Sequence, residues 1–288
     1  MTNVLITGAT GNVGIEVINA LFKLDHPLNI YAGVRDSVLE SEKLAKYKVK
    51  TVKFDFTNNE TYKAAIENID IIFLLRPPQI SDVKKYFAPL IDIIKQSSVS
   101  HIVFLSVQGV ENSKIIPHQK IEKLIVNSKI SYTFLRPAYF MQNFTSTLHA
   151  DLVNKNRIFL PAGSAKFTLV DVSDIGELTA KILGEIKSHL NKSYELTSNE
   201  KLSFLEMASK LSNKLNRTID YISPNLLNFY LTKRKEKMPS MLIIIMMMLH
   251  YLPRFQKEPK TTDCIEELLK RQPKTFEQFI TENKMNLC

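Results

Sequence analysis

VLITGATGNVG, residues 4–14, is the stretch that decides the fold of this chain. It joins an apolar strand to a Gly-x-x-Gly-x-x-Gly turn and to the start of an amphipathic helix. Gly8 permits the tight turn, Gly11 lets the backbone approach a pyrophosphate with no Cβ in the way, and Gly14 lets the helix pack closely on the strand. The helix N-terminus then offers free N–H groups and a partial positive charge to phosphates. The stretch therefore predicts a dinucleotide-binding turn. Two residues separate its first two glycines, where the Gly-x-Gly-x-x-Gly form has one.

Strand-like and helix-like segments alternate beyond this turn. Apolar runs of strand length lie at 4–7, 28–34, 50–54, 69–75, 101–106 and 131–135. Segments of helical period lie between them at 13–24, 37–46, 60–67, 84–97 and 117–127. Such alternation predicts an α/β fold in which helices cover both faces of a parallel sheet, and right-handed crossovers make that sheet doubly wound, of the Rossmann type.

The rhythm changes after Gln142, where short strands and scattered helices predict a smaller α+β lobe interwoven with the sheet. We therefore expect an NAD(P)-binding domain over residues 1–150 and a substrate lobe over residues 151–288.

The residue that follows the second strand indicates which dinucleotide fits. An acidic residue there accepts from the ribose 2′-hydroxyl of NAD, whereas an arginine suits a 2′-phosphate through charge-assisted hydrogen bonds. Arg35 takes this position. NADP(H) is therefore the expected cofactor and NAD(H) the alternative; the competing interpretation is that Arg35 is a solvated charge paired with Asp36.

The remaining site candidates follow other strands, because open α/β sheets bind ligands at the carboxyl ends of their strands. Asp55 would accept from an adenine amine or cap a turn, and Ser106 would contact the ligand or bond to backbone. Tyr139 and Phe140 would line the acceptor site or belong to the core. The expected cofactor contacts are Gly8, Thr10, Gly11, Asn12, Val13, Gly14, Arg35, Asp55, Phe56, Leu75, Arg76, Ser106 and Pro137. The expected acceptor-lining residues are Gln108, Tyr139, Phe140 and Asn143.

Four later motifs add to the glycine turn and Arg35. They are YTFLRP at 132–137, FMQN at 140–143, FTLVDVSDI at 167–175 and PKTFEQF at 273–279. With them the chain resembles, over nearly its whole length, the NmrA-like branch of the atypical short-chain dehydrogenases/reductases, and within that branch the bacterial NADPH-dependent quinone reductases and triphenylmethane dye reductases. The resemblance implies a Rossmann domain, an NADPH cofactor and a cleft for a flat, often aromatic acceptor.

The chain departs from ordinary short-chain dehydrogenases at the catalytic pair. Those enzymes carry Tyr-x-x-x-Lys after the fifth strand, where the tyrosine is the general acid/base and the lysine lowers its pKa. Aligning Glu122 with the glutamate that commonly follows that lysine places His118 at the lysine position and Lys114 at the tyrosine position. The His-x-x-x-Glu pattern is similar to that of the quinone and dye reductases. His118 is therefore the catalytic candidate, either as a proton donor or as a residue that only shapes the cofactor site.

Three functions compete for this pattern. The first is an NAD(P)H-dependent oxidoreductase that transfers hydride to a quinone-like or other conjugated small acceptor. Such an acceptor delocalises the developing charge, so the protein needs chiefly to position the nicotinamide against it. The second is a redox-sensing regulator of the NmrA type, which binds the dinucleotide and acts on a protein partner; the missing tyrosine favours it. The third, an epimerase or dehydratase of nucleotide sugars, is disfavoured by the absence of Tyr-x-x-x-Lys.

Composition and charge narrow the partners. The net charge of +9 comes from dispersed lysines, so we expect no nucleic-acid partner. Two cysteines, Cys264 and Cys288, match neither a metal site nor a disulfide framework. The first residues lack a signal-peptide pattern, which predicts a cytoplasmic protein, and we expect a monomer or homodimer. The apolar run Met241–Leu249 is about half of a membrane span, so it predicts a buried or pocket-lining helix and no membrane partner.

Overall fold

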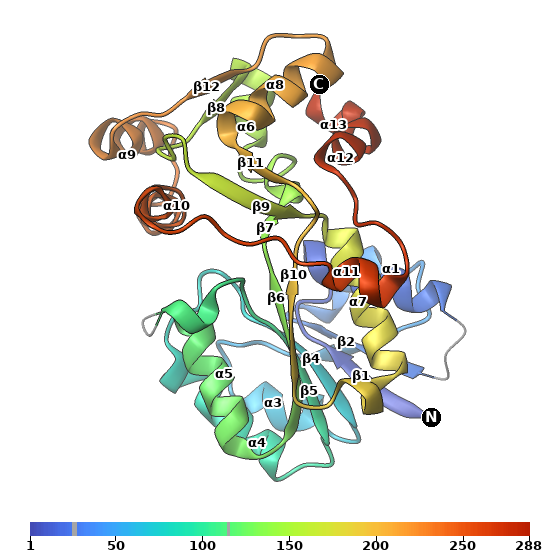
Figure 1. The fold of residues 1–288 in the computed structure, drawn as a ribbon. Coiled ribbons are helices and arrows are strands. Elements are labelled where there is room, and N and C mark those ends of the chain that lie inside the picture. The colour runs from blue at the N-terminus through green and yellow to red at the C-terminus, as the bar shows by residue number, and fades with distance from the viewer. Residues whose placement is uncertain (25–27, 114–115) are drawn as a thin grey trace. The chain divides into compact units, whose positions relative to one another are not determined.

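A seven-stranded parallel sheet forms the centre of the N-terminal part of the protein (Figure 1). The computed structural model describes residues 1–24, 28–113 and 116–288. The strand order is β10-β6-β5-β4-β1-β2-β3, and every neighbouring pair is parallel. The strands are β1 Thr2–Ile6, β2 Leu28–Val34, β3 Lys50–Lys53, β4 Ile71–Leu75, β5 His101–Leu105, β6 Ser131–Pro137 and β10 Lys192–Leu196. The order reverses at β1 and β4, which confirms the predicted doubly wound Rossmann-type fold.

The central strand β1 shows why this sheet forms. Val4, Leu5 and Ile6 are wholly buried, as a parallel strand covered on both faces requires. Val4 pairs with Ile30 of β2 and with Ile71 of β4. The glycine turn therefore leaves the sheet at its centre, at the carboxyl end where strand order reverses.

Helices cover both faces of this sheet. One face carries α3, α4 and α5, whose apolar side chains share a core with the sheet, and the other face carries α1 and α7 (Figure 1). Helices α1 and α7 approach closely because Gly176 has no side chain: a Cβ there would lie 2.6 Å from the carbonyl oxygen of Glu16. The helices are α1 Asn12–Lys23, α2 Ser37–Leu44, α3 Glu60–Ala65, α4 Val83–Lys95, α5 Pro117–Ser128, α7 Val172–Gly184 and α11 Cys264–Leu269.

The chain divides into two compact units that interleave along the sequence. Unit 1 holds the large sheet and consists of Met1–Pro137, Val172–Leu196 and Cys264–Lys270. Unit 2 consists of Ala138–Asp171, Thr197–Asp263 and Arg271–Cys288. A single boundary at residue 150 describes this division only coarsely, because α7, β10 and α11 return to unit 1 late in the sequence.

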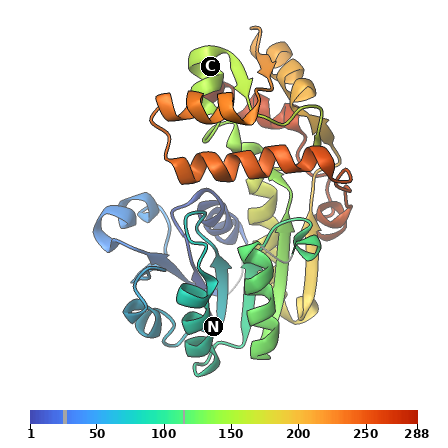
Figure 2. The same cartoon turned by 90° about the vertical axis from the view of Figure 1, so that its left-hand side faces the viewer.

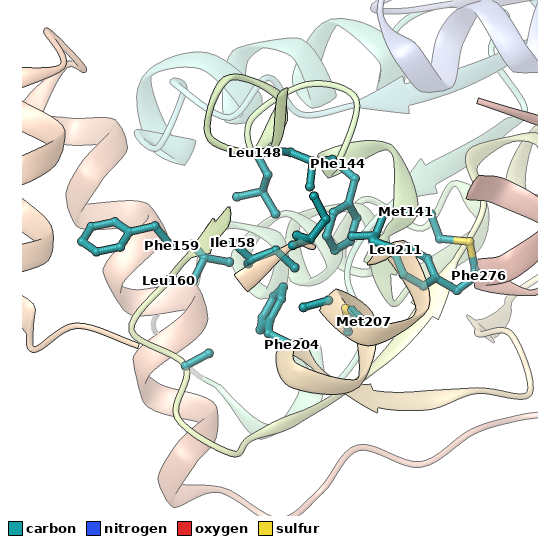
Figure 3. Close-up of a cluster of buried hydrophobic side chains, with 14 of the residues drawn as sticks. Met141, Phe144, Leu148, Ile158, Phe159, Leu160, Phe204, Met207, Leu211 and Phe276 are labelled. Carbon is teal, nitrogen blue, oxygen red and sulfur yellow. The ribbon is translucent and has the colours of Figure 1, made fainter. Parts of the chain in front are cut away.

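Unit 2 is built from short strands and helices around its own core. Its strands are β7 Tyr139–Phe140, β8 Arg157–Phe159, β9 Lys166–Val170, β11 Lys201–Ser203 and β12 Asp220–Ile222. They form a sheet of order β11-β9-β7 and a pair of β12 with β8. The helices are α6 His149–Lys155, α8 Phe204–Leu215, α9 Leu226–Lys235, α10 Ser240–Tyr251, α12 Phe276–Glu282 and α13 Lys284–Leu287. Figure 3 shows the core, in which Phe144, Phe204 and Phe276 lie among aliphatic side chains.

The helix expected over the apolar run Met241–Leu249 forms as α10, which packs beside α9 (Figure 2). Only one side of it is buried, through Ile243, Met246 and His250. Met241 is 66% exposed and Leu249 is 59% exposed, so of the expected buried or pocket-lining helix the structure shows burial along one side and not around the rest. The sequence is apolar all round the helix, and periodicity alone could not separate its two sides. Within the described residues, no helix is both long and apolar enough to cross a membrane.

Candidate functional site

The three glycines of the turn differ in what a side chain would meet. Gly8 has a φ of +62°, a left-handed conformation that favours glycine. A Cβ on Gly14 would lie 2.2 Å from the carbonyl oxygen of Gly8, so this position must be glycine for α1 to pack on the turn. Gly11 is extended, with φ −81° and ψ 169°, and its Cβ would meet only the Gly8 oxygen at 3.3 Å. Apart from this one tight contact and the chain neighbours of Gly11, no described atom lies within 4 Å of the place of a Cβ on Gly11.

The first turn of α1 fits a pyrophosphate. Gly11 is the N-cap and offers no side-chain oxygen to the helix. The first amides of an α-helix, here beginning with Asn12 and Val13, lack acceptors within the helix and carry its positive dipole end. Together with Gly11, which has no side chain, these amides form a cradle of the kind that phosphates occupy.

The end of β2 carries a contact that the sequence analysis missed. The Arg35 side chain is 69% exposed, and its Nη2 lies 3.8 Å from Oε1 of Glu40 in α2. Glu40 Oε2 accepts from the backbone N–H of Arg35 at 2.8 Å, and Glu40 Oε1 accepts from the Thr10 hydroxyl at 3.3 Å. Glu40 thus joins Arg35, at the end of β2, to Thr10 in the glycine turn.

Asp55 and Phe56, which follow β3, are engaged locally. Asp55 Oδ1 accepts from both the backbone N–H and the hydroxyl of Thr57, each at 2.8 Å, as in an Asx turn. Phe56 is buried edge-on against Phe54, with ring centroids 4.8 Å apart. Phe56 therefore belongs to the core, and Asp55 stabilises the turn through its Oδ1.

Arg76, at the end of β4, holds His118 of α5. Arg76 Nη1 donates to the carbonyl oxygens of Pro77, Pro78 and Ile80, and its Nε donates to Nε2 of His118 at 3.3 Å. Burial, and secondly the Arg76 charge, lowers the pKa of His118 to about 3. The imidazole is therefore neutral at pH 7, and since Nε2 accepts, its proton lies on Nδ1. Lys114, placed by alignment at the tyrosine position, lies outside the described residues.

Ser106 follows β5 with a hydroxyl that bonds to no described residue. Its Oγ is buried and lacks a hydrogen-bond partner in residues 1–24, 28–113 and 116–288, although its backbone N–H donates to Leu135 at 2.7 Å. A buried hydroxyl without a partner is destabilising, so a backbone-bonded role does not account for this side chain. Gln108, two residues on, donates to Glu195 at 3.4 Å, and its backbone N–H donates to Pro137 at 2.9 Å.

Three acceptor-lining candidates, Tyr139, Phe140 and Asn143, belong to unit 2. The Tyr139 ring packs against Phe204, and its hydroxyl lies 3.2 Å from Nε2 of His250. Burial raises the pKa of Tyr139 well above its usual value, which keeps the phenol protonated. Tyr139 is thus part of the aromatic packing of unit 2. Phe140 and Asn143 are half-buried beside it.

Unit 1 gathers the remaining candidates on one edge of its sheet. The glycine turn follows β1, Arg35 follows β2, Arg76 follows β4 and Ser106 follows β5. Leu75 touches the glycine turn directly, since its side chain lies 3.2 Å from where a Cβ of Gly8 would be. The carboxyl edge and its glycine turn define a Rossmann-type protein with a dinucleotide-binding turn.

The chain belongs to the NmrA-like family, whose model matches residues 1–280. It is 28% identical to prestalk A differentiation protein A of Dictyostelium discoideum, over 99% of this chain and 93% of that protein. It is 27% identical to an NAD(P)H azoreductase of Xenophilus azovorans, over 96% of each chain. The fold is also that of a Citrobacter sp. triphenylmethane reductase complexed with NADP(H), with a TM-score of 0.85 at 24% identity over 97% of this chain and 99% of that one.

Proposed function

We propose that this chain is an NADP(H)-dependent oxidoreductase that reduces a quinone-like or otherwise conjugated small acceptor. The observation that carries the proposal is the carboxyl edge of the sheet, where a phosphate cradle follows β1, an exposed arginine follows β2 and an unpartnered buried hydroxyl follows β5. Relatives named as an azoreductase and a triphenylmethane reductase support an acceptor with an extended conjugated system.

The residues of this edge have separate roles toward NADP(H). The amides that follow Gly11 hold the pyrophosphate, and Arg35 holds the 2′-phosphate. Ser106 donates its free hydroxyl to the nicotinamide end, which satisfies a group that the fold leaves unpaired. A bound reduced nicotinamide supplies hydride, and the second proton that a quinone needs comes from solvent.

His118 acts here as a neutral positioning group. Arg76 holds its Nε2, so the Nδ1 proton is the one available for a hydrogen bond to cofactor or acceptor. A pKa of about 3 leaves almost no imidazolium at pH 7, which argues against His118 as a general acid. Reduction of a conjugated acceptor tolerates this, because the developing charge spreads over the acceptor.

A regulatory function is the second candidate. No tyrosine stands at the position of the usual general acid, and the Dictyostelium relative is named for a differentiation process. In this case the same edge binds the dinucleotide without turnover, and a protein partner senses the bound state.

The deciding experiment follows the absorbance of reduced nicotinamide with a panel of quinones and triphenylmethane dyes. We expect NADPH oxidation that depends on the acceptor. Tight NADPH binding without oxidation by any acceptor would favour the regulatory function.

The same assay with His118→Gln tests the positioning role. Glutamine keeps a hydrogen-bonding group of similar reach but no titrating proton. We expect the turnover of His118→Gln to stay within about tenfold of the wild type from about pH 5.5 to about pH 8.5. A reduction of this size is what the loss of one neutral hydrogen bond would cause. A loss of roughly 10²–10⁴-fold that follows a titration would instead assign His118 as the general acid.

We also propose that the protein works in the cytoplasm, as a monomer or a homodimer. Both of its cysteines are free thiols, and burial raises the pKa of Cys264 to about 12, so that this thiol is unreactive.

A further inference from the structure

Three hydrogen-bond donors and the Arg35 guanidinium surround the Glu40 carboxylate beside the end of β2. Oε2 accepts from the backbone N–H groups of Arg35 at 2.8 Å and Asp36 at 3.4 Å. Oε1 accepts from the Thr10 hydroxyl at 3.3 Å and lies 3.8 Å from Arg35 Nη2. Two amides, a hydroxyl and a guanidinium form a complete anion site, and a side chain of the same protein fills it.

This anion site lies at the edge of the sheet where the Rossmann fold binds the adenosine ribose. In the Rossmann fold the glycine turn after β1 and the residues after β2 enclose the 2′-position of the ribose. Thr10 belongs to the first of these segments, and Arg35 and Asp36 belong to the second. A 2′-phosphate and the Glu40 carboxylate therefore require the same donors, and two anions cannot share them without strong repulsion.

We propose that Glu40 is a specificity-determining residue that competes with the 2′-phosphate for its own binding site. NADPH must displace the carboxylate from Thr10 and Arg35 before Arg35 can turn to the phosphate. NADH leaves the carboxylate in place, where it accepts from the ribose 2′-hydroxyl. Glu40 thus narrows the preference for NADPH that Arg35 creates, and it makes this protein a dual-cofactor enzyme. This inference rests on the proposed cofactor site.

The test compares Glu40→Gln with Glu42→Gln by calorimetric titration of NADPH, NADH and adenosine 2′,5′-bisphosphate. The glutamine introduced by Glu40→Gln keeps the side-chain length and a hydrogen-bond acceptor but loses the charge. Glu42 is an exposed residue of the same helix, so its substitution removes the same charge without touching Thr10 or Arg35. We expect Glu40→Gln to bind NADPH and the bisphosphate about tenfold more tightly, which is the size expected for one charge-assisted contact. Its affinity for NADH should stay the same or weaken.

Three outcomes would overturn the inference. Equal effects of Glu40→Gln and Glu42→Gln would indicate a general charge effect. If both cofactors bind the wild type and Glu40→Gln leaves the ratio of their affinities unchanged, the proposed role of Glu40 is overturned and the cofactor site is not. Absence of binding of either dinucleotide to the wild type would overturn the cofactor site as well, which separates the failure of the proposed function from that of this inference.

Discussion

Gly11 and Gly14 lie three residues apart in one turn, yet their substitutions should have opposite consequences. A Cβ on Gly14 would overlap the carbonyl oxygen of Gly8 at 2.2 Å, whereas a Cβ on Gly11 would lie 3.3 Å from the same oxygen, which a small shift can accommodate, and the backbone of Gly11 is extended. Gly14 therefore serves the packing of α1 on the turn, and Gly11 serves the approach of a ligand.

Gly11→Val should fold normally and lose dinucleotide binding. A β-branched residue suits the extended backbone of Gly11, but its side chain would occupy the place of the pyrophosphate. We expect a melting temperature close to that of the wild type and no detectable NADPH binding by calorimetry. Gly14→Val is the matched control, and it should unfold the N-terminal unit because its Cβ would overlap the backbone. Wild-type affinity in a folded Gly11→Val variant would place the cofactor elsewhere.

The sequence predicted the glycine turn, Arg35 and Ser106 at the edge of the sheet, because strand ends and turn chemistry are local properties. It could not predict Glu40, which reaches Thr10 thirty residues away through the fold. The sequence could not predict that His118 Nε2 accepts a hydrogen bond, since the donor, Arg76, follows β4 and lies 42 residues before His118 in the sequence. The one available signal for Glu40 was an acidic residue in the first turn of the helix after Arg35.

At the level of elements, a buried charge cluster ties α6, β8 and α9 together in unit 2. Lys233 of α9 and Asp151 of α6 are both nearly inaccessible and form an ion pair. Arg157 of β8 lies 3.0 Å from Asp151, and Glu236 just beyond α9 lies 2.8 Å from Lys233. The sequence showed only a basic run near Lys233, since its partner lies 82 residues away.

Asp151→Asn should destabilise the protein by about 1.5–3 kcal/mol, the range for a hydrogen bond to a charged group, because Lys233 loses its buried partner and keeps the partly exposed Glu236. The second substitution Lys233→Met should recover part of this loss, since it removes the buried charge that Asp151→Asn leaves with one partner fewer. Urea denaturation of the two single variants and the double variant measures the coupling. Strictly additive losses would show that the pair contributes nothing as a pair.

The main elements of unit 1 were predictable because its strands are apolar on both faces and its helices are amphipathic. Unit 2 was predictable only as a lobe of short elements. Its core joins segments from three separate stretches of the chain, and strands of two to five residues carry too little periodicity to reveal their pairing. The partial exposure of α10 was hidden for the related reason that all of its faces are apolar.

For the whole molecule, buried histidines predict sensitivity to acid. Burial lowers the pKa of His101 to about 4, and the charge of nearby His189 is the second cause of this lowering. Burial also lowers the pKa of His250 to about 4. The pKa of His118 is about 3 for the reasons given above. Unfolded histidines titrate near 6.5, so these groups favour the folded state fully above that pH and progressively less as the pH falls toward 4.

The free energy of unfolding should therefore decrease as the pH falls from about 6.5 to about 4, by up to about 1.4 kcal/mol per pH unit for each such histidine. His101→Gln should flatten this dependence, since it removes one titrating group while keeping a partner for Thr133, whose hydroxyl lies 2.9 Å from the ring. Urea denaturation at several pH values provides the measurement. A stability that is constant down to pH 4 would contradict the buried, neutral state of these rings.

The interleaving of the two units determines when the protein can fold on the ribosome. After Pro137 has been synthesised, β6 is still the edge strand of the sheet and α1 lacks α7. Strand β10 covers that edge only when residues 192–196 emerge, and α11 joins unit 1 with residues 264–270, close to the last residue, Cys288. An open, apolar strand edge is a site of aggregation for as long as it persists. We therefore expect a product truncated before residue 192 to leave the edge of β6 uncovered and to aggregate more readily than the full chain.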